Sequence, residues 1–241
     1  MNKVVLITGS AKRVGAVIVE VFHHAGYRVI VHYRQSEKEA KKLVEKLNHV
    51  REKSAACVFA DLDQFDHYKK LIDESVSIFG QLDILMNNAS TFFKTPIGNI
   101  TEQDWNLLLN SNLKAPLFLS QLAAPFLEKN NGNIINIIDI HAKKPMKNYP
   151  VYSCAKAGLF MLTRSLALAL APSIRVNAVA PGHVIWPENQ EAFSESEKKE
   201  ILLKTFLQKA VNPEDIAKTA LFLAEQSSIT GQMICVDGGR F

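Results

Sequence analysis

The sequence has 241 residues, of which 47% are hydrophobic and 22% are charged, and its formal net charge is +4. A mild positive charge, with lysines and arginines scattered among acids, argues against a nucleic-acid-binding protein. No apolar run approaches the roughly 18 residues that span a bilayer, and three widely spaced cysteines without CxxC spacing predict neither disulfides nor zinc. We therefore expect a cytoplasmic protein with no membrane or nucleic-acid partner and no metal.

Seven short runs rich in β-branched residues alternate with longer periodic segments. The runs cover residues 3–8, 27–33, 54–60, 82–87, 133–139, 174–180 and 232–237. Most are apolar throughout, as in strands covered on both faces, and segments such as Val14–Ala25, Glu37–Val50 and Tyr68–Phe79 have a helical pattern. The alternation predicts the α/β class: a single-domain Rossmann fold over residues 1–241, with a seven-stranded doubly wound parallel sheet and helices on both faces.

Two glycines, Gly9 and Gly15, lie in the turn between the first strand and the first helix. Such a turn brings backbone N–H groups and a helix N-terminus close to a pyrophosphate. Arg13 stands where a glycine would complete GxGxxG; it is either a surface arginine or, within this turn, a bidentate phosphate ligand. We expect Gly9, Arg13, Val14 and Gly15 to bind a dinucleotide.

The second strand ends in "VHYRQS", which contains no acid for a ribose diol. The cation Arg34 and the hydroxyl of Ser36 suit a 2′-phosphate, so the sequence predicts NADPH, with His32 and Tyr33 beside it. Ser36 can equally cap the following helix, since it forms a capping-box pattern with Glu39.

Tyr152 is the one tyrosine with a lysine four residues later, and on a helix Tyr152 and Lys156 share a face. An ammonium beside a phenol favours the phenolate and lowers the tyrosine pKa, which would make Tyr152 a proton donor near neutral pH.

Further motifs accompany this pair in a fixed order. They are "TGSAKRVG" (8–15), "NNAS" (87–90), Asn112, "PG" (181–182) and "VDGG" (236–239). In this order and spacing they resemble the short-chain dehydrogenase/reductase family over essentially the whole chain. The resemblance implies that Asn112 holds a water that feeds a Lys156 proton relay, and that the protein is a homotetramer. It also implies cofactor contacts by Asp61, Leu62, Asn88, Ala89, Ser90, Tyr152, Lys156, Pro181, Gly182 and Val184.

Asp139 departs from the common pattern of that family. Most members carry a serine thirteen residues before the tyrosine, whereas this chain has a carboxylate, which only accepts hydrogen bonds when ionised. It suits a substrate with N–H donors better than a ketone. The alternatives are an aspartate that caps a loop and a ketone reductase with a protonated Asp139.

Three other deviations, Arg13, "HYRQS" and "NNASTFF", make the chain similar to the pteridine reductases, as does Asp139. That resemblance implies a pterin substrate stacked on Phe92, with Arg13, Ser90, Asp139 and Tyr152 as further substrate ligands; Phe92 could instead serve only in packing.

The resulting hypothesis is NADPH-dependent reduction of a dihydropterin at a C=N bond, with Asp139, Tyr152, Lys156 and Asn112 as catalytic residues. Oxidised pterins or folates are additional candidate substrates. The alternatives are a carbonyl reductase of 3-oxoacyl thioesters and a non-catalytic NADP-binding sensor. The irregular segment near 183–200 predicts a substrate lid at about 183–208. His183 and Trp186 within it could line the pocket or only pack the lid.

Overall fold

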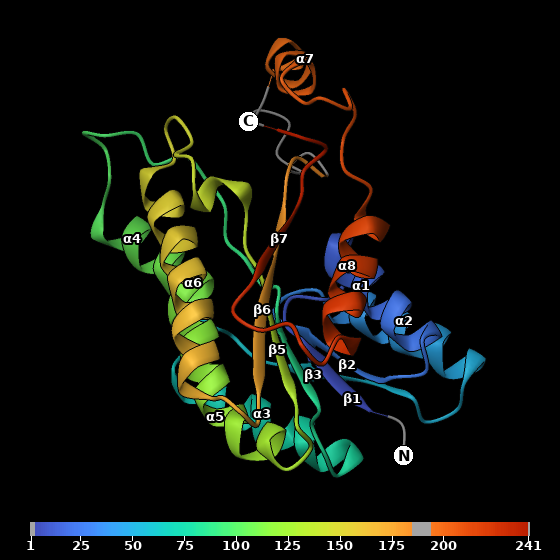
Figure 1. The fold of residues 1–241 in the computed structure, drawn as a ribbon. Helices are drawn as coiled ribbons and strands as arrows, with labels where there is room; N and C mark the ends of the chain where they lie inside the picture. Colours follow the sequence, from blue (N-terminus) through green and yellow to red (C-terminus); the bar gives the residue numbers. More distant parts are fainter. Residues whose placement is uncertain (1–2, 185–193, 241) are drawn as a thin grey trace.

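The computed structural model describes residues 3–184 and 194–240, and its centre is one parallel β-sheet (Figure 1). The strands are β1 (Val4–Ile7), β2 (Arg28–Tyr33), β3 (Ala55–Phe59), β4 (Ile84–Asn87), β5 (Asn133–Ile137), β6 (Arg175–Pro181) and β7 (Met233–Val236). Their order across the sheet is β3-β2-β1-β4-β5-β6-β7, and every neighbouring pair is parallel. The seven strands that the sequence predicts are therefore confirmed.

Helices connect the strands and lie on both faces of the sheet. They are α1 (Arg13–His24), α2 (Glu37–Val50), α3 (Asp66–Phe79), α4 (Glu102–Leu109), α5 (Ala115–Glu128), α6 (Pro150–Ala169), α7 (Glu195–Leu203) and α8 (Pro213–Glu225). A π-helical turn, η1 (Asn110–Lys114), joins α4 to α5, and a 3₁₀ turn, η2 (Ile140–Ala142), follows β5. None of these described helices is long and apolar enough to cross a membrane.

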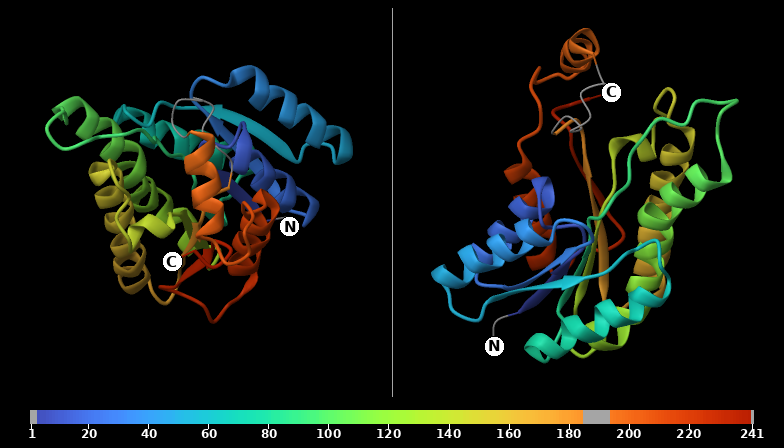
Figure 2. Two further views of the ribbon diagram at one scale, coloured as in Figure 1. Left: turned by 90° about the horizontal axis from the view of Figure 1, so that it is seen from above. Right: turned by 180° about the vertical axis from the view of Figure 1, so that it is seen from behind.

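Side-chain alternation along β1 explains the two layers of helices. Val5 and Ile7 belong to a buried cluster that includes residues of α1, α2 and α8, whereas Val4 and Leu6 belong to a second cluster with residues of α3 and α5. Successive side chains of a strand point to opposite faces, so an all-apolar strand requires a helical layer on each side. Figure 2 shows this division from above and from behind.

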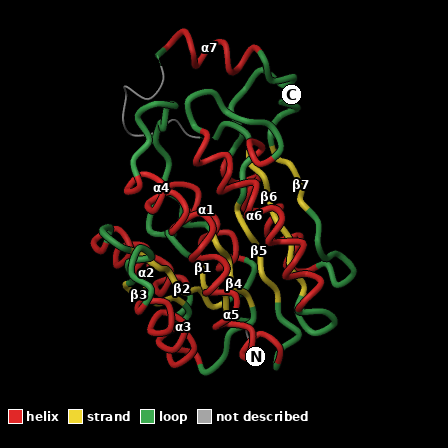
Figure 3. The backbone as a smooth tube through the Cα atoms, turned by 90° about the vertical axis from the view of Figure 1, so that its left-hand side faces the viewer, coloured by secondary structure: helices red, strands yellow, loops and turns green. Residues whose placement is uncertain are grey.

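The order of the strands determines where a ligand can bind. The chain runs outward from β1 to β3 and then returns to place β4 on the other side of β1. Open sheets of this kind bind ligands at such a switch point, outside the carboxyl ends of the strands. The helix α7 lies beyond these ends (Figure 3).

Two local features differ from the sequence prediction. The strand β5 ends at Ile137, so Asp139 is not a strand residue but the N-cap of η2. The segment expected to be irregular contains α7, which begins with a capping box formed by Ser194 and Glu197. Trp186, expected to line the pocket, lies outside the described residues.

Candidate active site

A cleft of about 640 Å³ opens at the carboxyl ends of the strands. The predicted site residues that line it are Gly9, Arg13, Val14, Gly15, His32, Tyr33, Arg34, Ser36, Leu62, Asn88, Ala89, Ser90, Phe92, Asp139, Tyr152, Lys156, Pro181, Gly182 and Val184. Asp61 and Asn112 do not line it. His183, named as a lining residue of the expected lid, does.

The glycine turn brings the start of α1 against β4. A Cβ on Gly9 would lie 2.8 Å from the Ala89 Cα, and a Cβ on Gly15 would lie 2.7 Å from the Asn88 Nδ2, so neither position accommodates a side chain without a shift. No side chain caps α1, and its first turn has no acid. Its N-terminal N–H groups are thus left for an anion, which is what a pyrophosphate requires.

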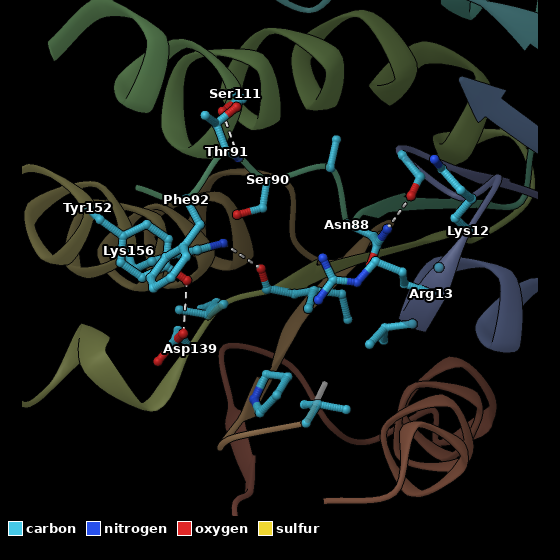
Figure 4. Close-up of a pocket in the computed structure, with 18 of the residues that line it drawn as sticks. Lys12, Arg13, Asn88, Ser90, Thr91, Phe92, Ser111, Asp139, Tyr152 and Lys156 are labelled. Carbon is cyan, nitrogen blue, oxygen red and sulfur yellow. Dashed lines mark hydrogen bonds between the residues drawn. The ribbon is translucent and has the colours of Figure 1, made fainter. Parts of the chain in front are cut away.

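Arg13 occupies the left-handed region of backbone conformation, with φ of 56°. This region is unfavourable for residues that carry a Cβ, which explains why a glycine is usual at such a position. The side chain extends from the turn into the cleft (Figure 4). The strained backbone therefore holds a guanidinium beside the open end of α1.

His32 of β2 stabilises the glycine turn through a hydrogen bond. Its Nδ1 accepts the Gly9 N–H at 2.8 Å, and its Nε2 lies 3.1 Å from the Ala60 carbonyl oxygen. These two bonds fix the neutral tautomer with hydrogen on Nε2, and burial lowers the pKa of His32 to about 4. Both ring nitrogens are thus engaged within the protein, so the expected cofactor contact cannot use them.

The end of the cleft at Arg34 contains an acid, Asp63, that the sequence did not indicate. The Arg34 Nη1 donates to Asp63 at 2.8 Å and lies 3.5 Å from Asp61. Asp63 lines the cleft whereas Asp61 does not. Ser36 is the N-cap residue of α2 but makes no capping hydrogen bond, and Glu39 lies 3.7 Å from Lys12 instead. The predicted capping box is therefore absent.

The side chains of Asp139, Tyr152 and Lys156 lie close together in another part of the cleft. The Tyr152 hydroxyl donates to Asp139 Oδ2 at 2.8 Å, and Asp139 Oδ1 accepts the His141 N–H at 2.8 Å. Lys156 donates to the Ile137 carbonyl at 3.2 Å, and its Nζ lies 5.6 Å from the centroid of the Tyr152 ring. Asp139 thus caps η2 with one oxygen and accepts a hydrogen bond from the tyrosine hydroxyl with the other; Figure 4 shows the bond to Tyr152.

The pKa of Tyr152 is raised well above 10, so the expectation of a lowered value was wrong. Burial is the largest cause, followed by the charge of Asp139 and its hydrogen bond, and the bond with Ser90 opposes them only in part. Burial also lowers the pKa of Lys156 to about 8, while Asp139 raises it. Tyr152 is therefore a neutral phenol and Lys156 is largely protonated at neutral pH.

Asn112 lies within the π-turn η1 and is fully buried. Its Oδ1 accepts from the Ser90 hydroxyl at 2.7 Å, and its Nδ2 donates to the Thr91 carbonyl at 2.8 Å. The side chain thus fixes the loop after β4, and its predicted role in a relay to Lys156 stays a prediction.

Phe92 packs against two tyrosines. Its ring stacks on Tyr149 with centroids 4.6 Å apart and meets Tyr152 edge-on at 4.8 Å. It also lines the cleft. The packing interpretation is therefore correct for one face of the ring, while a stacking role toward a ligand stays a prediction.

Sequence reasoning missed part of the lining. These residues are Ala11, Lys12, Gln35, Asp63, Thr91, Ser111, Ile137, Ile138, Ile140, His141, Met146, Ile201 and Arg240. Many of them are sequence neighbours of predicted site residues, and this adjacency was the signal by which they could have been found. Ile201 lies within the expected lid at 183–208, although it was not named singly. Arg240 lies far along the chain, and only the fold brings it to the cleft.

Comparison with known proteins identifies relatives of this chain. The family model described as enoyl-(acyl carrier protein) reductase matches residues 9–240. A 3-oxoacyl-[acyl-carrier-protein] reductase from Staphylococcus aureus is 35% identical over 100% of this chain and 99% of its own. Pteridine reductase 1 from Leishmania tarentolae is 33% identical over 98% of this chain and 95% of its own.

A solved structure has the same fold. FolM alternative dihydrofolate reductase 1 from Brucella suis, in complex with NADP, is 34% identical and superimposes with a TM-score of 0.92 over 99% of this chain and 95% of its own. With the glycine turn, the Tyr152–Lys156 pair and the parallel sheet in place, the chain belongs to the short-chain dehydrogenase/reductase family and lies close to its pteridine reductases.

Proposed function

We propose that this chain is an NADPH-dependent reductase of pterins that transfers hydride to a C=N bond of a dihydropterin, with Tyr152 as the proton donor. The observation that carries the proposal is the 2.8 Å hydrogen bond from Tyr152 to Asp139 within the cleft. The similarity to a pteridine reductase and to a dihydrofolate reductase of this fold supports it.

The residues present fit a nicotinamide dinucleotide. The uncapped start of α1 and the guanidinium of Arg13 suit its pyrophosphate, and Arg34 and Ser36 suit a 2′-phosphate. Bound NADPH would supply the hydride. Because no acid stands at the end of β2 itself, we expect a preference for NADPH over NADH.

Asp139 favours a nitrogen heterocycle as substrate. Each carboxylate oxygen already accepts one hydrogen bond, and an ionised carboxylate has about four acceptor positions. The remaining positions suit ring and amino N–H groups, whereas an alkoxide that develops from a ketone would be repelled by the charge.

Tyr152 is set up to give a proton. Because burial and Asp139 raise its pKa, the phenol keeps its hydrogen until hydride transfer to the C=N carbon leaves an electron pair on the adjacent ring nitrogen and makes that nitrogen strongly basic. Lys156, charged below a pKa of about 8, lies near the ring and stabilises the phenolate that results. General acid catalysis of this kind contributes about 10²–10⁴-fold.

Asp139→Ser tests the proposal. We expect kcat/KM for 7,8-dihydrobiopterin with NADPH to fall about 10²-fold or more. The Kd for NADPH should stay unchanged because residue 139 lies apart from Arg13 in the phosphate-binding turn (Figure 4). Serine is as good an N-cap as aspartate, so η2 is retained, and circular dichroism checks the fold. A variant with full pterin activity would contradict the role of Asp139.

A second candidate is a carbonyl reductase of 3-oxoacyl thioesters, favoured by the 35% identity to the Staphylococcus aureus protein. It would use the same Tyr152 and Lys156. NADPH oxidation measured in parallel with dihydrobiopterin, dihydromonapterin, dihydrofolate and an acetoacetyl thioester, and repeated with NADH, separates the two. We expect turnover of the pterins and none of the thioester.

The homotetramer, the cytoplasmic location and the lid at 183–208 belong to the same proposal and stay predictions. Within the lid segment, Ile201 of α7 and His183 line the cleft. A lid that closes on the substrate is consistent with their position.

A further inference from the structure

The chain segment after β7 is held in place beside α7. Two glycines with left-handed backbone, Gly238 with φ of 68° and Gly239 with φ of 77°, turn the chain after the strand. The carbonyls of Gly239 and Gly238 then accept the N–H groups of Phe206 and Leu207 at 3.2 and 3.0 Å. An antiparallel bridge joins Thr205 to Arg240. The backbone of Arg240 is therefore positioned by pairing.

This pairing places Arg240 in the substrate half of the cleft. Arg240 lines the cleft together with His183 and Ile201. Burial lowers the pKa of Arg240, and the charge of Asp139 raises it. Burial first, and then the charge of Arg240, lower the pKa of His183 to about 4. The guanidinium thus acts on both Asp139 and His183.

Arg240 differs from the other cations of the cleft in its contacts. Arg34 pairs with Asp63, Lys12 with Glu39, and Lys156 with a backbone carbonyl, and Arg13 also has an interaction partner. Among residues 3–184 and 194–240, by contrast, Arg240 has no hydrogen bond or ion pair. A half-buried guanidinium with unused donors is costly, and such a donor set matches a carboxylate in bidentate geometry.

Asp139 does not fill this role. One of its oxygens is held by the His141 N–H and the other by Tyr152, and no ion pair within 4.0 Å joins it to Arg240 in the described structure. A carboxylate that enters with the substrate matches the open donors better.

We infer that Arg240 binds a carboxylate on the side chain of the pterin substrate, so that the cleft favours folate-type pterins over those with an uncharged side chain. This inference rests on the proposed pterin reductase function. The site would consist of the Arg240 guanidinium at its centre, with Ile201 and His183 as the neighbouring wall.

The test compares 7,8-dihydrofolate, which carries carboxylates, with 7,8-dihydrobiopterin, which carries none. We expect Arg240→Ala to lower kcat/KM for dihydrofolate about tenfold or more through KM. Because the Arg240 charge also acts on Asp139, kcat/KM for dihydrobiopterin should change as well, but by a much smaller factor. Arg240→Lys keeps the charge and should retain part of the dihydrofolate activity. Arg164→Ala, which removes an exposed arginine of α6, is the matched control and should change neither value.

The outcomes separate this inference from the function on which it rests. An equal loss with both substrates, or no loss with either, overturns the role of Arg240 while pterin reduction by the wild type stands. A wild-type protein that reduces neither pterin overturns both. A loss that is much larger with dihydrofolate than with dihydrobiopterin, and that lies in KM, supports the inference. A KM for dihydrofolate that rises with salt in the wild type but not in Arg240→Ala supports it further.

Discussion

Arg13 combines an unfavourable backbone with a side chain directed into the cleft. Its φ of 56° lies in the left-handed region, which glycine adopts readily and other residues rarely adopt. A residue with this backbone strain persists only where the surrounding structure holds it. The sequence shows that an arginine replaces a glycine in this turn, and from this position alone it predicts a guanidinium beside the phosphate site. The strain that accompanies it could not be anticipated without the backbone.

Replacement of Arg13 by glycine or alanine separates the strain from the charge. Both variants lose the guanidinium, so we expect both to bind NADPH about tenfold or more weakly. Arg13→Ala retains the strained backbone, whereas Arg13→Gly relieves it, and the glycine variant should be more stable by about 1 kcal/mol. Urea unfolding and fluorescence titration with NADPH measure the two effects. Equal stability of the variants would show that the turn is not strained.

At the same scale, Tyr152 shows how far a local pattern can be used. The spacing of Tyr152 and Lys156 predicts that they share a helix face, and the structure confirms their proximity. The direction of the Tyr152 pKa was wrong because burial and the Asp139 charge outweigh the lysine. Asp139 was recognised from the sequence, but its hydrogen bond to the phenol required the fold.

At the scale of elements, buried polar side chains join α6 to the centre of the sheet. Asn87 of β4 donates to Asn136 of β5 at 2.8 Å, and Asn136 donates to the hydroxyl of Thr163 on α6 at 2.9 Å. Thr163 follows Lys156 by seven residues, which is about two turns along the same face. These bonds fix the helix that carries Tyr152 relative to the strand that precedes Asp139.

Thr163→Val should disturb this connection. The valine fills the space of threonine but leaves the Asn136 N–H group without an acceptor in the interior, which costs about 1–3 kcal/mol of unfolding free energy. We expect kcat to fall more than the Kd for NADPH changes, because the phosphate-binding turn lies on other elements. Thermal unfolding and steady-state kinetics test this.

The control is Thr163→Ser, which keeps the hydroxyl. If Thr163→Val and Thr163→Ser proved equally stable and equally active, the polar connection would have no part in positioning α6.

Element by element, the strands were predictable because β-branched apolar runs are the signature of a sheet covered on both faces. The ends of the strands were less predictable. For example, β5 ends at Ile137, and Asp139 is the N-cap of η2. The helix α7 was missed although Ser194 and Glu197 carry the capping-box signature, because its weak apolar periodicity resembles a loop.

At the scale of the whole molecule, the cleft combines residues from nearly the full length of the chain. Asp63 and Arg240 belong to no sequence motif that indicates a site, and each becomes part of the cleft through strand order and backbone pairing. Sequence spacing cannot show which charge faces which across a sheet. The glycine turn, "NNAS", "PG" and "VDGG", in contrast, lie at or just after the carboxyl ends of strands, and Tyr152 with Lys156 shares one helix, so their sequence patterns were sufficient to find them.

The pH dependence of stability follows from His32, which is buried and neutral in the fold. Its folded pKa of about 4 lies below the ordinary value of 6.5, so the unfolded chain binds more protons between these values. The contribution of His32 to stability is therefore fully present above about pH 6.5 and is lost as the pH falls toward 4, by about 3 kcal/mol. His183, whose pKa is also lowered to about 4, adds to the loss in the same pH range. Chemical denaturation at a series of pH values measures the slope.

His32→Asn is the control for this prediction. Asparagine places an acceptor where Nδ1 accepts the Gly9 N–H but does not titrate, so its stability should vary less over the same range. A slope equal to that of the wild type would assign the effect to other groups.

The capping role of Asp139 has a consequence for how such a cleft changes over evolutionary time. Aspartate and serine are about equally good N-caps, so either residue can satisfy the His141 N–H that begins η2. Yet one offers the substrate a fixed negative charge and the other a hydrogen-bond donor. If Asp139 selects the substrate as proposed, a single substitution would exchange heterocycle chemistry for ketone chemistry, and a lineage would not have to pass through a poorly folded ancestor to make that exchange.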